Sequence, residues 1–352
     1  MMEKTPMAGY DRIVAHSFGG PEVLVVEHVA ALPQPGGGEV RVRVEAAGVG
    51  YTDTILRRGR YVLYKGGLPL TPGYDMVGVV DALGDGVEGL RVGDRVADMP
   101  VHGAYSQYVL SPARDLVAVP AGVDPVAAVE VPLMGVTAWQ MLTRCVSLPH
   151  GATILVVGAS GAVGRLLVTL GRHLGLTVIG TASAAKLPLV EGLGATAIDY
   201  RRDDLAEAIR AAGGGRGVDA AFDAIGGTSW ETSWAALAEG GTLVGYGMQD
   251  FLETGGPSSG VLAAIQRFNV TWNEDGATDG TNRRTIFYDI NERRPRLPDE
   301  YRADAGHLLD LIAQGTLVPP PAETLPLDRA AEAHRRVAAG DLQQRLVLTP
   351  AA

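Results

Sequence analysis

The residues with the clearest chemistry lie in one short glycine-rich stretch, Gly158-Ala159-Ser160-Gly161-Ala162-Val163-Gly164. It directly follows a continuous apolar run and opens a helix-like segment. Gly161 would let the backbone approach a pyrophosphate, and Gly164 would let the helix pack closely on the preceding strand. The free amides at the helix start would then face the anion. Ala159 replaces the first glycine of the common fingerprint, but the strand–turn–helix context still predicts a dinucleotide-binding turn.

The end of the next strand indicates which dinucleotide fits. An NAD site places an acidic residue there to bind the ribose hydroxyls. Here residues 181–186 contain no acid, and the first one downstream is Glu191. Ser183 and Lys186 could donate hydrogen bonds to a 2′-phosphate, which a carboxylate would repel. Tyr200, after the third strand, could add a hydroxyl. The alternative is that Lys186 is an ordinary solvated helix residue, but the pattern favours NADPH.

Charge and cysteine content exclude several other classes. The chain has 352 residues and a net charge of -10, which argues against a nucleic-acid or anionic-membrane surface. The single cysteine, Cys145, rules out an intrachain disulfide and any zinc site built from several cysteines. Residues 1–6 carry no apolar signal, and no apolar run is long enough to span a membrane. We therefore expect a cytoplasmic enzyme or binding protein.

The elements that would position these residues are of two kinds. The first third of the chain is β-rich, and Glu39–Glu45 alternates apolar and polar residues as a half-buried strand does. In the middle, strands alternate with helices, which predicts a doubly wound α/β domain. Its predicted strands are Thr153–Val157, Leu176–Gly180, Ala195–Ile198, Val218–Phe222 and Gly241–Val244.

The change in character predicts two domains. The β-rich domain comprises residues 1–125 and 293–352, because a helix at Glu300–Ala313 and a final strand at Gln344–Leu348 return the chain to it. The α/β domain comprises residues 126–292.

Taken together, these landmarks resemble the medium-chain dehydrogenase/reductase superfamily over nearly the whole chain. They are Glu45–Asp53, Thr71–Asp75, Val92–Val96, Gly103–Tyr108 and the turn Ala159–Gly164. The resemblance implies a GroES-like catalytic domain beside a Rossmann coenzyme-binding domain.

Two of the landmarks differ from the zinc enzymes of that superfamily. Zinc alcohol dehydrogenases carry Cys-His-Thr-Asp where this chain has Gly50-Tyr51-Thr52-Asp53, and Gly-His-Glu where it has Gly73-Tyr74-Asp75. Without these soft ligands no zinc site of the usual kind is expected. The chain therefore resembles the zinc-free quinone oxidoreductases and enoyl reductases. This implies hydride transfer from NADPH to a quinone, or to the activated C=C bond of an enone or enoyl thioester.

The resemblance also implies positions that contact the cofactor. Ser160, Gly161, Ala162 and Val163 form the pyrophosphate turn, and Ser183, Lys186 and Tyr200 form the 2′-phosphate set. The remaining contacts are Thr137 beside the nicotinamide amide, Gly245 and Tyr246 in the loop bordering the nicotinamide, and Arg345 against the pyrophosphate.

The substrate side departs from the family pattern. Gly50 stands where quinone oxidoreductases usually have Asn, so the substrate orientation of relatives does not transfer directly. Tyr51 and Tyr61 are the candidates for a proton donor or substrate contact. Ordinary packing of either tyrosine is the alternative.

Residues 250–297 form a segment longer than its counterpart in simple quinone oxidoreductases. We expect a helix at Ser259–Phe268, a loop through Gly280 that borders the cleft, and a strand at Arg284–Asp289. In relatives a strand here pairs across a two-fold axis, which predicts a homodimer.

Two further interpretations stay open at this point. One is a tailoring enoyl reductase in a polyketide-type pathway, and the other is an NADPH-binding, crystallin-like protein without turnover. Acceptor-dependent oxidation of NADPH distinguishes them from a general quinone or alkene reductase.

Overall fold

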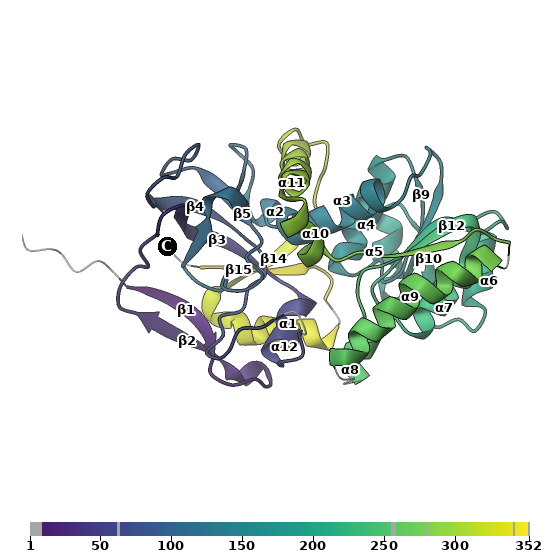
Figure 1. Cartoon of the computed structure of the whole chain (residues 1–352), viewed down its shortest axis with the longest axis horizontal. Coiled ribbons are helices and arrows are strands. Elements are labelled where there is room, and N and C mark those ends of the chain that lie inside the picture. The colour runs from purple at the N-terminus through teal and green to yellow at the C-terminus, as the bar shows by residue number, and fades with distance from the viewer. Residues whose placement is uncertain (1–8, 62–63, 255–257, 279, 341, 351–352) are drawn as a thin grey trace, which may run out of the picture. The chain divides into compact units, whose positions relative to one another are not determined.

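A computed structural model of the chain describes residues 9–61, 64–254, 258–278, 280–340 and 342–350 (Figure 1). Residues 1–6, for which the sequence predicts no apolar signal segment, lie outside the described part. The chain divides into two compact units, Met1–Leu133 with Leu297–Ala352 and Met134–Arg296, called unit 1 and unit 2 below. Unit 1 is β-rich and unit 2 alternates strands and helices, which confirms the predicted fold class.

Unit 1 is built on a seven-stranded sheet with the order β14-β15-β3-β4-β5-β7, in which β6 also pairs with β3. A separate two-stranded sheet pairs β1 with β2. The strands are β1 Tyr10–Ala15, β2 Leu24–Val29, β3 Glu39–Val49, β4 Met76–Leu83, β5 Arg95–Asp98, β6 Tyr108–Pro112, β7 Val117–Ala118, β14 Ala322–Pro326 and β15 Arg345–Thr349. The helices are α1 Tyr51–Arg57, α2 Pro125–Ala128, α11 Pro298–Ala313 and α12 Ala330–Ala339.

Strand β3 organises this sheet. It is longer than the alternating segment that predicted it, and its pairing with β4 shifts register between Arg41 and Val42 and again between Val44 and Ala46. Such irregularities bend a strand and increase its twist. As a result β3 pairs with β4, β6 and β15, and its buried face carries the hydrophobic core of unit 1.

Unit 2 contains a six-stranded parallel sheet with the order β10-β9-β8-β11-β12-β13. The strands are β8 Thr153–Val156, β9 Thr177–Ala182, β10 Thr196–Asp199, β11 Val218–Asp223, β12 Leu237–Gly245 and β13 Arg284–Phe287. The helices are α3 Val136–Gln140, α4 Ala162–His173, α5 Leu187–Gly192, α6 Leu205–Ala212, α7 Thr228–Ala236, α8 Gln249–Thr254, α9 Ser258–Thr278 and α10 Ile290–Arg296. The strand order reverses between β8 and β11, where doubly wound sheets bind their ligands at the carboxyl ends of the strands.

Helix α9 corrects the expectation for residues 259–280. The helix predicted at Ser259–Phe268 continues to Thr278, so the expected loop is mostly helical (Figure 1, long green helix). Its later turns carry aromatic residues that pack with one another. Trp272 contacts Trp230 and Phe268, with ring centroids 6.5 and 5.6 Å away, and this packing stabilises helix where the local composition indicated a loop.

Helix α9 also covers the outer edge of β13. Asn273 Oδ1 accepts a hydrogen bond from the Thr285 amide at 2.6 Å, and its Nδ2 donates to the Thr285 carbonyl at 3.3 Å. One helical turn earlier, Asn269 Oδ1 accepts from the Phe287 amide at 3.0 Å. These are the backbone groups that a strand from a second subunit would use. In this chain those groups are engaged by α9, and the predicted pairing of β13 across a two-fold axis stays a prediction.

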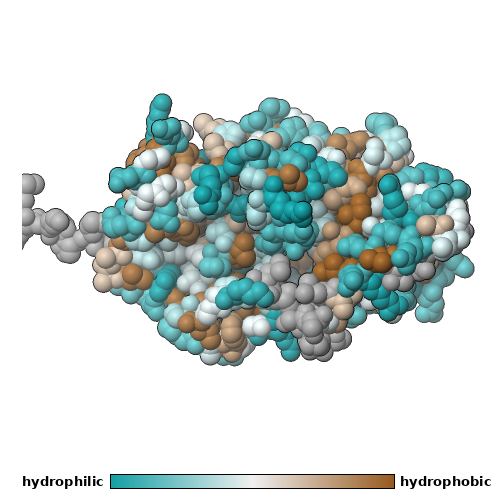
Figure 2. Space-filling model, viewed as in Figure 1, coloured by the Kyte–Doolittle hydropathy of each residue, from teal (hydrophilic) through white to brown (hydrophobic). Residues whose placement is uncertain are grey.

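Among the described residues, one helical stretch is long and apolar enough by composition to cross a membrane, Pro125–Cys145. Of its most apolar window 72% is buried inside the protein, as expected of a core helix. On the face shown in Figure 2, hydrophilic residues cover much of the surface and hydrophobic ones lie in small groups.

Candidate functional site

The turn after β8 has the geometry that its glycines predict. Gly158 takes the left-handed conformation at φ 69°, which a residue with a side chain rarely adopts. A Cβ on Gly164 would lie 2.3 Å from the Gly158 carbonyl oxygen, so only glycine allows α4 to start this close to the turn. Gly161 is the N-cap of α4 and has no side chain that could cap the helix, so the first amides of α4 have no partner within the helix. These residues fit the pyrophosphate of a dinucleotide.

The departure at Ala159 has a structural explanation. Ala159 is fully buried, and a Cβ on Gly180 of β9 would lie only 2.7 Å from the Ala159 methyl group. The glycine that the common fingerprint has in the turn is thus replaced by Ala159, and the glycine opposite it is Gly180 on the neighbouring strand. The Ala159 amide donates to the Thr181 carbonyl at 2.9 Å, which attaches the turn to β9.

The predicted 2′-phosphate residues are brought together at the carboxyl ends of β9 and β10. Ser183 follows β9 and begins a helical turn that ends at Lys186, whose amide donates to the Ser183 carbonyl at 2.8 Å. Tyr200 follows β10, and its amide donates to the Ala182 carbonyl at 3.2 Å, next to Ser183. The Tyr200 side chain is 49% exposed, and the Arg201 guanidinium stacks over its ring at 5.5 Å.

The carboxyl ends of β11 and β12 hold Asp223 and the predicted pair Gly245 and Tyr246. The Tyr246 amide donates to the Asp223 carbonyl at 3.1 Å, and burial raises the pKa of the Tyr246 hydroxyl. The Asp223 carboxylate accepts from Ser229 Oγ at 2.7 Å and Ser233 Oγ at 2.8 Å, and burial raises its pKa. Asp223 thus anchors α7 to the sheet, a role that only its position at the end of a predicted strand could have suggested.

Thr137 lies on α3, which packs against α4 within unit 2, and its side chain is buried. The structure therefore places it in the same unit as the turn. Its contact with a nicotinamide amide stays a prediction.

In unit 1 the two candidate tyrosines lie in different environments. Tyr51 is the first residue of α1, and the Arg58 guanidinium lies 5.9 Å from the centre of its ring. Tyr61 lies beyond the end of α1, and its hydroxyl is 2.7 Å from the hydroxyl of Tyr74. Tyr74 stands where zinc relatives have a zinc-ligating histidine, and nothing local in the sequence indicated its contact with Tyr61.

Beneath these tyrosines lies a buried carboxylate, Asp53. It accepts hydrogen bonds from the Gly50 amide at 2.8 Å and the Gly73 amide at 3.1 Å, so it joins the two loops at which zinc ligands would stand in relatives. Burial raises the Asp53 pKa to about 7, although the Gly50 amide opposes this effect. The Tyr105 hydroxyl also hydrogen-bonds to Asp53 and lies 3.3 Å from His334 Nε2.

Arg345, which the resemblance places against the pyrophosphate, is engaged with carboxylates in this structure. Its guanidinium is buried and donates to both Asp75 oxygens, at 3.0 and 2.8 Å, and to Glu130 Oε1 at 3.1 Å. Although burial lowers its pKa, the two carboxylates raise it overall, so the guanidinium stays charged. A Cβ on Gly48 would lie 1.8 Å from its Nη2, so β3 makes room for this ion pair. The observed contacts assign Arg345 to holding unit 1 together and lend no support to a pyrophosphate contact.

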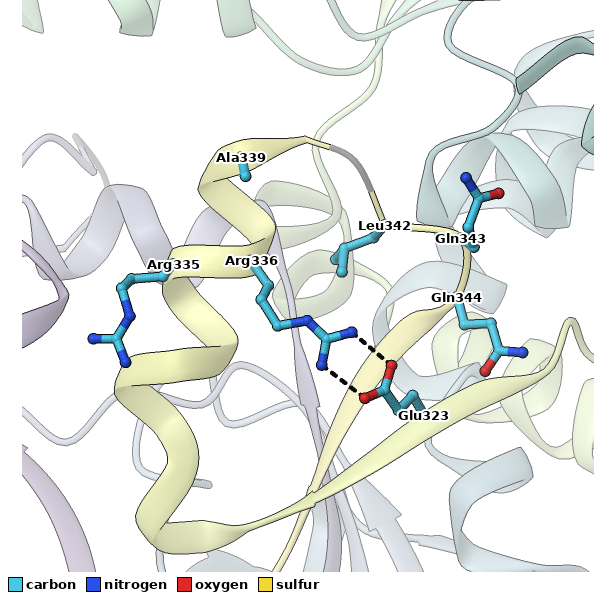
Figure 3. Close-up of a pocket in the computed structure, with 7 residues that line it drawn as sticks. All are labelled: Glu323, Arg335, Arg336, Ala339, Leu342, Gln343 and Gln344. Carbon is cyan, nitrogen blue, oxygen red and sulfur yellow. Dashed lines mark hydrogen bonds and ion pairs between the residues drawn. The ribbon is translucent and has the colours of Figure 1, made fainter. Parts of the chain in front are cut away.

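A separate depression of about 650 Å³ lies on unit 1 between the end of α12, β14 and the turn before β15 (Figure 3). Its main charged groups already pair with each other, since Arg336 donates to both Glu323 oxygens at 2.7 and 2.6 Å. None of the predicted site residues lines it. Within the described ranges, no group of three or more His, Cys, Asp or Glu side chains is arranged to hold a metal ion.

The doubly wound unit with its glycine turn and the GroES-like unit define a nicotinamide-dependent oxidoreductase fold. Residues 36–121 match the alcohol dehydrogenase GroES-like domain, and residues 193–348 match the family described as zinc-binding dehydrogenase. The chain belongs to the medium-chain dehydrogenase/reductase superfamily, in its zinc-independent quinone oxidoreductase and enoyl reductase branch. It is an enzyme of the oxidoreductase type.

Several relatives match it over nearly its whole length. A 2-haloacrylate reductase from Burkholderia sp is 34% identical over 348 residues, covering 96% of this chain and 98% of the relative. A quinone oxidoreductase from Pseudomonas aeruginosa is 33% identical, covering 96% and 99%. The structure of Escherichia coli quinone oxidoreductase complexed with NADPH superimposes with a TM-score of 0.82 at 27% identity, covering 97% and 100%.

Proposed function

We propose that this protein is a cytoplasmic, NADPH-dependent reductase of small molecules that carry an activated C=C bond or a quinone. The observation that supports it best is the grouping of Ser183, Lys186 and Tyr200 at the ends of β9 and β10, with no acidic residue at the end of β9. The nearest strand end with a carboxylate is that of β10, where Asp199 Oδ1 accepts the Arg201 amide at 3.1 Å.

When bound, the reduced nicotinamide supplies the hydride. The chain's own residues bind and orient it. The amides of Ala162 and Val163 would face the pyrophosphate beside Ser160 and Gly161, and Ser183, Lys186 and Tyr200 would donate to the 2′-phosphate. The Gly161 amide itself donates to the Gly158 carbonyl at 2.8 Å. Thr137, Gly245 and Tyr246 border the nicotinamide ring. Charge pairing at Lys186 would favour NADPH over NADH in this arrangement.

An activated alkene or a quinone is the acceptor class that the relatives favour. One relative is named for the reduction of 2-haloacrylate, which is an alkene conjugated to a carboxylate, and another is named a quinone oxidoreductase. In either reduction the acceptor gains a hydride and then a proton. Tyr61 and Tyr51 are the side chains of unit 1 that we propose to contact the acceptor or supply that proton.

The cofactor assignment is tested by the variant Lys186→Glu. Because it replaces a donor with a repelling carboxylate, we expect the ratio of kcat/KM for NADPH to that for NADH to fall by roughly 10- to 100-fold, as for the loss of a charge-assisted hydrogen bond. Oxidation of each dinucleotide would be followed with a quinone, an enone, a crotonyl thioester and a 2-haloacrylate.

The matched control is Arg267→Glu, which makes the same change of charge at an exposed position of α9. It should leave the cofactor ratio unchanged. An equal effect of both variants, or wild-type turnover with NADH in preference to NADPH, would contradict the assignment. Binding of NADPH without oxidation by any acceptor would favour a crystallin-like role.

A further inference from the structure

Tyr74 and Tyr61 form a hydroxyl pair that no local sequence feature predicts. The two oxygens are 2.7 Å apart, and the rings meet edge to face with centroids 6.1 Å apart and an interplanar angle of 70°. Tyr74 is buried, with 2% of its surface exposed, whereas Tyr61 is half-buried. One hydroxyl of the pair thus belongs to the protein interior, and the other belongs to a residue that solvent or a ligand can reach.

Tyr74 lies in the most constrained loop of unit 1. Before it, Gly73 has φ 106° and donates to the buried Asp53 carboxylate, and a Cβ there would lie 2.4 Å from the Tyr105 amide nitrogen. After it, both carboxylate oxygens of Asp75 accept hydrogen bonds from Arg345 Nη2. The Tyr74 carbonyl accepts from the Val101 amide at 3.2 Å. Both neighbours of Tyr74 are fixed by buried charges, so the position of its ring is fixed as well.

The backbone around Tyr61 constrains its side chain less than the loop around Tyr74 constrains that of Tyr74. Tyr61 lies just beyond α1, where the Arg60 amide donates to the Ile55 carbonyl at 3.0 Å and the Tyr64 amide donates to the Tyr61 carbonyl at 3.1 Å. These bonds set the course of the backbone but leave the direction of the Tyr61 ring to its side-chain contacts. One such contact is with the hydroxyl of Tyr74, 2.7 Å from the Tyr61 hydroxyl.

We propose that Tyr74 is a positioning residue, which holds the Tyr61 phenol in place and donates a hydrogen bond to its oxygen, so that Tyr61 can give its own proton to the reduced acceptor. This inference rests on the proposed reductase function and assigns the proton donor within it. Tyr74 thereby gives a new role to a position that holds a metal-ligating histidine in zinc relatives.

The proposed step balances as follows in an alkene reduction. The hydride from the dihydronicotinamide forms a C–H bond at the β-carbon, the C=C electron pair moves to the carbonyl oxygen, and an enolate results. The Tyr61 O–H bond then breaks, and its proton goes to the α-carbon of the enolate, where a C–H bond forms and the carbonyl group is restored. The phenolate left on Tyr61 is stabilised by the hydrogen bond from Tyr74. Solvent returns one proton to Tyr61, which its half-buried position allows.

The first test observes the pair without requiring turnover. In protein labelled with 13C at the tyrosine hydroxyl-bearing carbon, the Tyr61 resonance is identified by its loss in Tyr61→Phe. We expect it to shift in Tyr74→Phe and to stay in place in Tyr10→Phe. Tyr10 is a matched control because it is also buried and also packs edge to face, against Tyr108 at 5.9 Å. An unmoved Tyr61 resonance in Tyr74→Phe would overturn the proposal.

The second test is a double-mutant cycle on turnover. We expect Tyr61→Phe to lower kcat by on the order of 100-fold, as for loss of a general acid, and Tyr74→Phe to lower it by roughly 3- to 10-fold, as for loss of one hydrogen bond. The KM for NADPH should not change. Because Tyr74 acts through Tyr61, adding Tyr74→Phe to Tyr61→Phe should cost nothing further.

Additive losses in the double variant, or a wild-type rate in Tyr74→Phe, would overturn the role of Tyr74 while leaving the reductase function intact. A wild-type protein that reduces no acceptor would instead remove the reductase function, and the proton-donor role would fall with it. The labelled-tyrosine spectra separate these cases, since they report the pair itself.

Discussion

At the scale of single residues, the most unusual feature is the charge buried beneath the two zinc-free loops. Asp53, Asp75 and Glu130 share one compensating cation, Arg345, and all four side chains are nearly inaccessible to solvent. Asp53 makes hydrogen bonds with two backbone amides and the Tyr105 hydroxyl rather than with that cation. Burial therefore dominates its protonation and raises its pKa from 3.8 to about 7.

This raised pKa predicts how stability depends on pH. In the unfolded chain Asp53 loses its proton near pH 3.8, whereas in the folded protein it keeps the proton up to about pH 7. Its contribution to the free energy of unfolding is therefore complete below about pH 4 and is lost as pH rises to 7. At about 1.4 kcal/mol per pH unit, the loss amounts to at most about 4 kcal/mol. The difference in stability between wild type and Asp53→Asn should shrink by up to that amount over this range.

Urea unfolding at a series of pH values measures this difference, and Asp219→Asn is the control. Burial raises the pKa of the partly exposed Asp219, but Arg216 and the Thr153 amide outweigh this and lower it overall. The stability difference between wild type and Asp219→Asn should therefore grow only up to about pH 3.8 and stay constant from there to pH 7. A gap for Asp53→Asn that stays constant or widens with pH would show that Asp53 is ionised in the folded protein.

At the scale of elements, the joint between β8 and α4 shows how a sequence pattern can be kept while one of its residues changes. The glycine missing at position 159 is compensated by Gly180 on β9, because the Ala159 methyl group occupies the space that a Gly180 side chain would need. Gly164 has no such freedom, since a Cβ there would meet backbone atoms of Gly158 and Ala159 at 2.3 and 2.9 Å. Backbone cannot move aside as the end of a flexible side chain can.

Gly164→Ala should therefore displace the turn and weaken dinucleotide binding. We expect the Kd for NADPH to rise by at least roughly 10-fold, because shifts of a few tenths of an ångström misalign several amides toward the pyrophosphate. Calorimetric titration measures the affinity. Gly192→Ala is the control, since a Cβ there has open space, and its affinity should match wild type. Equal affinity of Gly164→Ala and wild type would mean that the pyrophosphate binds elsewhere.

At the scale of the whole molecule, the free edge of the unit 2 sheet is closed by side chains rather than by a second strand. An exposed edge strand invites pairing with another chain. Asn269 and Asn273 are four residues apart, so they lie on one face of α9, and they engage two amides and one carbonyl of β13. The same face packs its aromatic residues against Trp230 and Phe287. The helix thus acts as a cover for the edge.

Removing both asparagine side chains should open that edge. In Asn269→Ala/Asn273→Ala, we expect a loss of about 1–3 kcal/mol for each backbone group left without a partner, together with new self-association at higher protein concentration. Light scattering after size-exclusion chromatography measures the mass, and urea unfolding measures the stability. The control Gln266→Ala/Arg267→Ala changes exposed residues of α9. Wild-type mass and stability in the asparagine variant would show that the edge does not depend on these side chains.

The sequence by itself determined the features that depend on neighbouring residues. The alternating pattern predicted β3, the apolar run with its glycine turn predicted β8 and α4, and the absence of an acid after β9 singled out Ser183 and Lys186. Each is a local pattern in which a few consecutive residues carry both the conformation and the chemistry. The sequence also identified the missing zinc ligands, because a ligand set is a matter of residue type.

Only the tertiary structure decided which distant residues meet. Tyr61 and Tyr74, Arg345 with Asp75, and Asn269 with Phe287 are joined by chain folding and not by any periodicity. It also overrode local propensity, since residues 269–278 are helical where Asn269 and Asn273 bind β13 and Trp272 packs on Trp230 and Trp234 of α7. Burial, which sets the protonation of Asp53 and commits Arg345 to its carboxylates, is a property of the assembled core, and no segment of the sequence contains it alone.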